Sequence, residues 1–333
     1  VNMIKGTSQS DAAVVVVSSL EGEFENDISK IGQTREMLTL AQTFGIKRII
    51  IAVNKMDSRK VSYSKHRFDE IENKMIELMK EVGYKKNQYK IIPISGLRGD
   101  NLIHKSSNLS WWLGGTLLEN LDQLEIPTRP LNGSLRVPVQ SVYREIGRSS
   151  LPCGRICSGT LKRDSKIIFV PGNKVVKVSK IKMYREEYSE GFPGNNVVIE
   201  PDRSIEVLPG QVCGEMERDP PRICEQFTCE MTILNNYEDK IRSGKQQYTL
   251  CCHTSHVKCE ITKITKKTDQ NHRVTDNPKT IKKGDKATVD IKPVEPIVVE
   301  RYDEYPELGC FCIRHRKQTI AFGVIRNVEK KPL

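Results

Sequence analysis

The sequence predicts an α/β domain followed by two all-β blocks, and three observations support this division. First, apolar strands and amphipathic helices alternate over the first 126 residues. Second, the helical periodicity largely stops at the Pro- and Gly-containing stretch 126–134, which is typical of a linker. Third, the remaining chain consists of short β-rich runs, and the polar segment 219–224 divides it into two blocks, each the size of a small β-barrel or sandwich.

The first domain is expected to contain a parallel sheet covered by helices. Its strands are apolar, β-branched runs that read as buried, and its helices carry apolar residues at helical spacing. Because ligands bind at the carboxyl ends of parallel strands, the residues after each strand are the place to look for a site. The expected strands are 13–19, 47–53 and 89–94; the expected helices are 33–44, a segment that starts near Ser62 or Ser64 and ends at Gly83, and 116–124.

The two later blocks are expected to contain strands and few helices. Their apolar runs are short and are bounded by Gly, Pro, Asp and Asn, which favour turns. The predicted strand regions are LRVPVQSVY, KIIFVPG, KVVKVSKIKMY and NNVVIE in the first block, and FTCEMTIL, HVKCEITKI, KATVDIKP, EPIVVERY and TIAFGVIRNV in the second.

Composition excludes several classes of protein. The chain has 333 residues, a net charge of +11 and 37% hydrophobic residues, which excludes wholesale disorder. Its longest apolar runs are far shorter than the ~18 residues that a membrane span requires, so we expect no membrane partner. The ten cysteines form no regular framework and follow no signal peptide, which favours a reducing, cytoplasmic location.

The strongest functional motif is Asn54-Lys55-Met56-Asp57, directly after a buried strand. Guanine presents an N1–H and a 2-amino group side by side, and an ionised carboxylate accepts from both, so Asp57 is expected to read the base. Asn54 would bond the opposite edge and neighbouring loops, and the stem of Lys55 would lie on the ring. A second loop, Ser95-Gly96-Leu97, follows another strand and is expected to close over the base. The alternative is that Asn54 and Asp57 cap local structure.

The segment CCHTSHVKC at 251–259 is weighed as a metal site because it holds three Cys and two His. If it is one strand, His253 and His256 point to opposite faces and cannot share a zinc ion. No CxxC pair exists in the chain. We therefore predict no metal site formed by this sequence.

Several motifs together resemble eukaryotic and archaeal translation elongation factor 1-alpha, of the translational GTPase family. They span nearly the whole chain in one order: NMIKGTSQSD, EGEFENDISKIGQTREMLTLAQTFGIK, NKMD, PISGLRGDN, CGRICSGTLKRDSKIIFVPG, SGKQQYTLCCHTSHVKC and YPELGCF. The resemblance implies an α/β P-loop-type GTPase domain at 1–130, its N-terminal part missing, followed by all-β barrel domains at 131–222 and 223–333. It implies delivery of aminoacyl-tRNA to the ribosomal A site in a GTP-dependent cycle.

The phosphate-binding part of that family's site is absent from the sequence. No G-x-x-x-x-G-K-[ST] loop is present, and the family's D-x-P-G-H element would lie ahead of Val1. We therefore expect an N-terminally truncated fragment, inactive as a GTPase by itself. The resemblance implies that GTP or GDP binds with Mg²⁺, that the Mg²⁺ ligands and catalytic residues lie in the missing segment, and that a guanine-nucleotide exchange factor is a partner.

The resemblance also implies an aminoacyl-tRNA surface on the two β-blocks. Arg185 and Asn196 match positions that contact the aminoacyl end, although Arg185 could equally be a solvated residue at a barrel edge. Cys157 stands where the family usually has a Glu. In the third block, His253 and Lys258 are candidates to face RNA, and the lysine-rich runs 263–269 and 279–286 could steer a phosphate backbone.

Two other functions remain open. A termination or ribosome-rescue relative of the same GTPase family would share the three blocks but bind a protein in place of tRNA. A non-enzymatic, basic RNA- or cytoskeleton-binding β-barrel protein would need no nucleotide pocket. The basic charge alone does not separate these alternatives.

Overall fold

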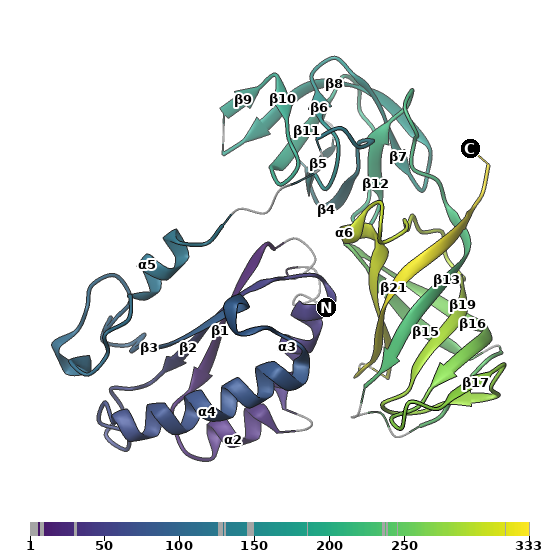
Figure 1. The fold of residues 1–333 in the computed structure, drawn as a ribbon. Coiled ribbons are helices and arrows are strands. Elements are labelled where there is room, and N and C mark those ends of the chain that lie inside the picture. Colours follow the sequence, from purple (N-terminus) through teal and green to yellow (C-terminus); the bar gives the residue numbers. More distant parts are fainter. Residues whose placement is uncertain are drawn as a thin grey trace. The chain divides into compact units, whose positions relative to one another are not determined.

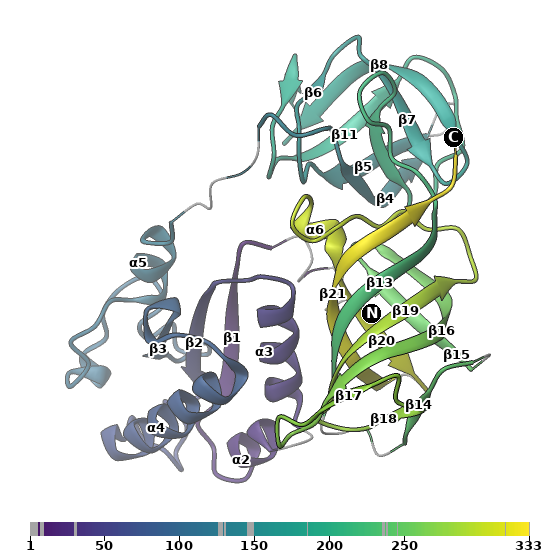
Figure 2. The ribbon, with the colours of Figure 1, turned by 45° about the vertical axis from the view of Figure 1, so that its right-hand side comes forward.

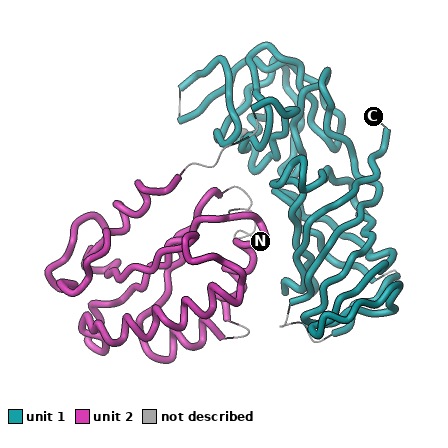
Figure 3. Tube along the Cα trace, in the orientation of Figure 1, with its two compact units in different colours: residues 1–9, 128–333 teal, residues 10–127 magenta. Residues whose placement is uncertain are grey.

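The computed structural model describes residues 6, 10–29, 32–125, 129, 131–144, 150–184, 186–234, 237, 239–244, 246–316 and 318–332. The chain forms two compact units (Figure 3). One is Ser10–Pro127, and the other comprises Val1–Gln9 and Thr128–Leu333. The first unit is α/β, and the second contains both β-rich blocks.

The α/β unit is built on a parallel sheet with the strand order β1-β2-β3 (Figure 1). The strands are β1 (Ala12–Ser18), β2 (Arg48–Asn54) and β3 (Tyr89–Pro93). Each lies within one residue of its predicted bounds. In the register, Val17 pairs with Val53, and Val53 pairs with Pro93, so the carboxyl ends of the strands meet at one edge.

Helices cover one face of this sheet. They are α2 (Glu23–Ile28), α3 (Gln33–Thr43) and α4 (Lys65–Val82), and their apolar residues share a core with alternate residues of the strands. The hydroxyl of Ser64 caps α4, and Gly83 ends it with φ 104°. The predictions for α3 and α4 are confirmed, whereas the six-residue α2 is too short to give a clear periodicity and was not predicted.

The opposite face packs against the segment that contains α5 (Leu117–Asp122). The 3₁₀ turn Ser107–Leu109 precedes α5 and places Leu109 in the core on the helix side. A further 3₁₀ turn, Lys86–Gln88, leads into β3. Ile50, Ala52 and Ile92 point to this side, where they contact Trp112 and Leu117. Burial on both faces explains why β2 is a continuous apolar run, whereas β1 leaves Val14 and Val16 exposed.

The first β-block closes into a barrel. Its ring has the order β11-β5-β4-β12-β7-β8, and β8 pairs back to β11. Alternate residues of these strands form its core. The strands are β4 (Val137–Arg144), β5 (Ser150–Arg155), β6 (Leu161–Lys162), β7 (Lys166–Val170), β8 (Lys174–Met183), β9 (Glu186–Tyr188), β10 (Glu190–Gly191), β11 (Asn196–Pro201) and β12 (Val212–Glu215).

The second β-block is also a closed barrel, in the order β15-β20-β21-β13-β19-β16, with β16 paired back to β15. Figure 2 shows β13 between β19 and β21. Its elements are β13 (Cys224–Ile233), β14 (Ile241–Arg242), β15 (Gln247–Cys252), β16 (Ser255–Thr268), β17 (Val274–Asp276), β18 (Thr280–Ile281), β19 (Lys286–Pro293), α6 (Pro306–Gly309), β20 (Cys310–His315) and β21 (Gln318–Lys330).

The two barrels share an apolar cluster. Ile168, Val170 and Val212, from strands of the first barrel, pack with Val298 and Leu308 of the second. All five side chains are at most 2% exposed. This shared core explains why the two barrels belong to one compact unit.

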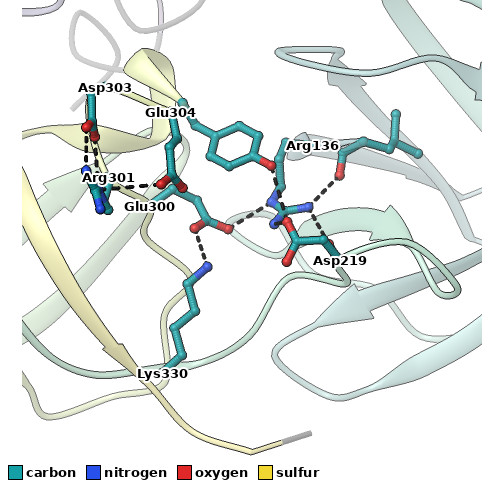
Figure 4. A network of polar contacts seen from close by, with 9 residues as sticks. Arg136, Asp219, Glu300, Arg301, Asp303, Glu304 and Lys330 are labelled. Carbon is teal, nitrogen blue, oxygen red and sulfur yellow. Dashed lines mark hydrogen bonds and ion pairs between the residues drawn. The ribbon is translucent and has the colours of Figure 1, made fainter. Parts of the chain in front are cut away.

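A buried ion network lies at the same junction (Figure 4). Arg136 is 0% exposed and Glu300 1%. The Nε of Arg136 donates to Glu300 Oε1 at 2.9 Å, and its Nη2 contacts Asp219 Oδ2 at 2.8 Å. Lys330 Nζ donates to the other Glu300 oxygen at 2.5 Å. The guanidinium also lies 4.7 Å from the ring centre of Tyr305, so each buried charge has a partner.

Among the described residues, no helix has the length and apolar character that crossing a bilayer requires.

We predict that Arg136→Met destabilises the barrels by about 3–5 kcal/mol, because it leaves Glu300 buried with a single cationic partner. Urea unfolding followed by far-ultraviolet circular dichroism measures the loss. The matched control is Arg326→Met, which removes a half-exposed Arg–Glu pair with Glu230 and should change stability little. Equal effects of the two substitutions would contradict the role of burial.

Candidate functional site

The end of β2 is joined to the loop after β3 through Asn54. Its Oδ1 accepts the backbone N–H of Lys55 at 2.7 Å and that of Gly96 at 2.8 Å. Lys55 has φ 65°, a conformation uncommon for a residue with a side chain. The parallel pairing therefore brings the predicted NKMD and SGL loops together, and Asn54 holds them in contact.

Asp57 makes the second link between these loops. Its Oδ1 accepts the hydroxyl of Ser95 at 2.7 Å, and Ser95 is 0% exposed. The same hydroxyl oxygen accepts the N–H of Arg98 at 3.0 Å, so the serine is fixed on both sides. Among the described residues, none forms a hydrogen bond with Asp57 Oδ2, and the side chain is half-buried. One carboxylate oxygen is thus positioned while the other is left for a ligand.

The structure answers in part the alternative that Asn54 and Asp57 cap local structure. Helix α4 is capped by Ser64 and begins eight residues after Asp57, so Asp57 caps no helix there. Asn54 does bond the turn that follows it, as that alternative proposed. Its second bond, to Gly96, links two loops and is more than a local cap.

Lys55 and Leu97 lie on the exposed side of this loop pair. Lys55 Nζ donates to Glu23 Oε2 at 2.6 Å, and both side chains are about half exposed. This bond, followed by one from Ser18, lowers the pKa of Glu23. Leu97 is 84% exposed. Lys55 therefore connects the loop after β2 to α2, a contact that the sequence analysis did not anticipate.

A polar network behind the two loops was also missed. The hydroxyl of Tyr63 donates to Asp100 Oδ2 at 2.6 Å, and that of Ser106 donates to Asp100 Oδ1 at 2.6 Å. The N–H of Ser95 donates to the Asp100 carbonyl at 3.0 Å. Partial burial, and then the bond to Asp100, raise the pKa of Tyr63 to about 12. In the sequence, the only signal for this network is Asp100, the acidic residue of the motif SGLRGDN.

The candidates on the first barrel differ in placement. Arg185 lies outside the described residues. Asn196 is exposed at the start of β11, where it pairs with Arg155. Cys157 is buried in the cluster between the barrels, and its thiol donates to the Arg155 carbonyl at 3.7 Å. Burial raises the pKa of this thiol, so Cys157 acts as a small apolar side chain.

The expectation that His253 faces RNA is wrong. Its ring is 2% exposed and bonds the Val298 carbonyl through Nε2 at 2.9 Å. Burial lowers the pKa of His253 to about 4, so the ring is neutral near pH 7. Lys258, on β16, is exposed as expected.

The reason for this error is a hairpin within CCHTSHVKC. We considered the segment as one strand, but β15 ends at Cys252 and β16 begins at Ser255, with His253 in the turn at φ 43°. Cys251 therefore lies opposite His256. In the part of the chain that the structure describes, no group of three His, Cys, Asp or Glu side chains is arranged to hold a metal ion.

Comparisons with known proteins bear on the identity of this arrangement. A family model described as the elongation factor Tu GTP binding domain matches residues 1–127, and one described as GTP-eEF1A C-terminal domain-like matches 226–326. Elongation factor 1-alpha of Meyerozyma guilliermondii is 40% identical over 99% of the chain and 74% of its own length. That of Plasmodium falciparum is 41% identical over 100% of the chain and 75% of its length.

The chain belongs to the elongation factor 1-alpha family. The predicted family and the predicted class of fold, a GTPase-type domain followed by two β-barrels, are thereby confirmed. The crystal structure of sup35 complexed with GDP is 29% identical, with a TM-score of 0.56 over 98% of this chain and 81% of that one. SelB from Methanococcus maripaludis, in its apo form, shares the fold at 17% identity, with a TM-score of 0.72 over 99% of this chain and 67% of that one.

We predict that Tyr63→Phe destabilises the α/β unit by about 1–2 kcal/mol, because Asp100 loses a charge-assisted hydrogen bond. Both tryptophans lie in this unit, and Trp111 Nε1 donates to the Tyr63 carbonyl, so tryptophan fluorescence during urea unfolding reports the change. Since folding raises the pKa of Tyr63 from 10 to about 12, the difference between the two proteins should be complete below pH 10 and disappear as pH rises through 12.

The matched control is Tyr188→Phe, which removes an exposed tyrosine bond to Glu186. Because Tyr188 lies on β9 of the first barrel, the substitution should leave unfolding of the α/β unit unchanged at every pH. An equal loss in both variants, or a loss that grows above pH 10, would contradict the role assigned to Tyr63.

Proposed function

We propose that the α/β unit of this elongation factor 1-alpha relative binds the guanine base of GTP or GDP between the loops after β2 and β3. The bond from Ser95 to Asp57 at 2.7 Å carries the proposal. It orients the carboxylate at the carboxyl edge of a parallel sheet, where nucleotide sites of such folds lie. The bond from Gly96 to Asn54 supports it, because the second loop is already closed against the first.

The geometry suits guanine better than adenine. A carboxylate accepts the N1–H and the 2-amino group of guanine together, whereas the corresponding edge of adenine offers neither donor. With Oδ1 of Asp57 held by Ser95, little side-chain entropy is lost when a base binds. The stem of Lys55 would cover one face of the ring, and the backbone of Gly96 and Leu97 would lie against its edge.

The phosphates need contacts that these 333 residues do not supply. The sequence contains no glycine-rich loop ending in Lys-Ser or Lys-Thr, and the described residues contain no group of three or more His, Cys, Asp or Glu side chains that could hold a metal ion. The residues present therefore do not fit Mg²⁺, and we assign no step to it. We propose that the chain by itself binds guanine nucleotides weakly and does not hydrolyse GTP.

The proposed role of the whole protein is delivery of aminoacyl-tRNA to the ribosome in a GTP-dependent cycle, with an exchange factor to release GDP. The relatives named elongation factor 1-alpha, at about 40% identity over nearly the whole chain, favour this role over termination or ribosome rescue. The closed Asp57–Ser95 arrangement favours it over a barrel scaffold without a nucleotide site. The protein would act in the cytoplasm, where charged tRNA meets ribosomes.

The proposed RNA surface is smaller than the one expected from sequence. Asn196 and Lys258 are exposed on the barrels, and Lys263 and Lys266 are exposed on the same strand as Lys258. His253 is not part of this surface because its ring is buried. For Arg185, a contact with the aminoacyl end of tRNA stays a proposal that rests on the family resemblance alone.

We predict that Asp57→Asn lowers affinity for GDP on the order of a hundredfold and creates affinity for xanthosine diphosphate, because an amide cannot accept from both guanine donors. The protein to test is the chain extended at its N-terminus with the phosphate-binding segment of a relative, and titration calorimetry measures binding. The unextended chain, in the same titration, should bind weakly or undetectably.

The control for this substitution is Asp69→Asn, which changes a carboxylate of α4 paired with Lys65 on the surface. It should leave both affinities unchanged. Unaltered base preference in Asp57→Asn would contradict the proposed base site.

We predict that Lys258→Ala, Lys263→Ala and Lys266→Ala together weaken binding of aminoacyl-tRNA by the extended, GTP-bound protein and reduce the salt dependence of binding. Each lost phosphate contact lowers the slope of log K against log salt by about 0.7–0.9. Filter binding at several salt concentrations measures both effects. Lys85→Ala with Lys86→Ala, which removes exposed lysines of the α/β unit, is the control and should change neither.

A further inference from the structure

Three neighbouring strands of the second barrel place two thiols and an imidazole in one row. Cys251 of β15 lies directly opposite Cys312 of β20 and, on its other side, directly opposite His256 of β16. Residues directly opposite in antiparallel strands share a face of the sheet. The adjacent residue on β15, Cys252, belongs to the barrel core, whereas Cys251 and Cys312 do not. The row therefore lies on the outer side of the barrel wall.

The spacing of the two thiols is suitable for a covalent bridge. Directly opposite residues in antiparallel strands have Cα atoms about 4.5 or about 5.5 Å apart. A disulfide spans Cα separations of about 4.4–6.8 Å, so either kind of pairing lies within its range. Both cysteines are free in this structure. The register therefore places the two cysteines within disulfide range in the folded barrel.

The environment of this pair differs from that of the other buried cysteines. A hydrogen bond from Cys312 lowers the pKa of the Cys251 thiol to about 5; burial opposes this effect, and His256 adds to it. The thiol of Cys252, in contrast, donates to backbone carbonyls of Leu308 and Cys310, and burial raises its pKa. Because the thiolate is the nucleophile in oxidation, the lowered pKa makes Cys251, and not Cys312, the candidate nucleophile of the pair.

His256 lies opposite Cys251, and its imidazole nitrogens are unsatisfied. Both ring nitrogens are buried, and neither forms a hydrogen bond of normal geometry with the described residues. An unbonded buried imidazole is costly, which is a reason to look for a function. Facing Cys251, it can hold the proton that a thiol gives up.

We propose that Cys251 and Cys312 form a reversible disulfide when the protein meets hydrogen peroxide, with His256 as the proton acceptor. The Cys251 thiolate attacks one peroxide oxygen, the O–O bond breaks, and the other oxygen leaves as water after it gains a proton. Cys251 is then a sulfenic acid. Cys312, after it loses its proton, attacks that sulfur, the S–O bond breaks, and a second water leaves.

The reaction balances without any further reagent. Two thiols lose two electrons and two protons in total, and one peroxide becomes two water molecules. Cys251 and Cys312 are 1% and 0% exposed, so peroxide reaches them when the strands open locally. The bridge would then join β15 to β20 beside the hairpin that carries His253.

The test treats the 333-residue chain with hydrogen peroxide at neutral pH and maps its tryptic peptides without reduction. The expected product links the peptide 246–258 to the peptide 302–314, loses two hydrogens in intact mass, and reverts with dithiothreitol. Each of these peptides contains two cysteines, so substitutions assign the bridge. Cys312→Ser should abolish the link and leave a sulfenic acid on Cys251 that dimedone traps.

The matched control is Cys310→Ser, two residues away on the same strand, which should leave the link intact. His256→Gln should slow formation of the link by about fivefold or more, since the proton acceptor is lost. Circular dichroism confirms that each variant is folded.

Three results would overturn the proposal. One is oxidation of Cys153, the single half-buried cysteine, with no linked peptide in the wild-type chain. Another is a link that survives in Cys312→Ser but disappears in Cys310→Ser. The third is a stoichiometric zinc ion bound to the purified chain that blocks the link, which would make the row a metal site.

Discussion

The candidate site depends on the parallel pairing of β2 with β3. Because parallel strands end at the same edge of a sheet, the register that opposes Val53 and Pro93 delivers Asn54, Asp57 and Ser95 to one place. The bonds from Ser95 to Asp57 and from Gly96 to Asn54 then fix two loops that are about forty residues apart in the chain. The geometry of the proposed base site therefore follows from sheet topology, and the loop residues refine it.

The two barrels illustrate how a charged group can be buried at a junction. Arg136 loses its water completely, and this is tolerable because Glu300, Asp219 and the ring of Tyr305 surround it. Apolar packing of Val298 and Leu308 excludes water from the same region. The apolar cluster supplies most of the attraction between the barrels, since a buried ion pair roughly balances its own desolvation.

Sequence patterns predicted the α/β unit well because burial on both faces of β2 demands a long apolar strand, and α4 carries a strong apolar face. They failed where one sequence pattern is compatible with two local structures. CCHTSHVKC alternates like a strand, yet two residues in its middle form a turn, which turned His253 inward and set Cys251 against His256. The network of Tyr63 and Asp100 was also missed, because its members are 37 residues apart and have no common motif.

By itself, the sequence determined the family, the order of the α/β unit and the β-blocks, and the residue types of the proposed guanine site. These follow from local patterns and short motifs, which act within a few residues. Only the tertiary structure decided which side chains meet: Asp57 with Ser95, Arg136 with Glu300, and Cys251 with Cys312. Such contacts depend on strand register and closure of the barrels, and these are set by the packing of the whole unit.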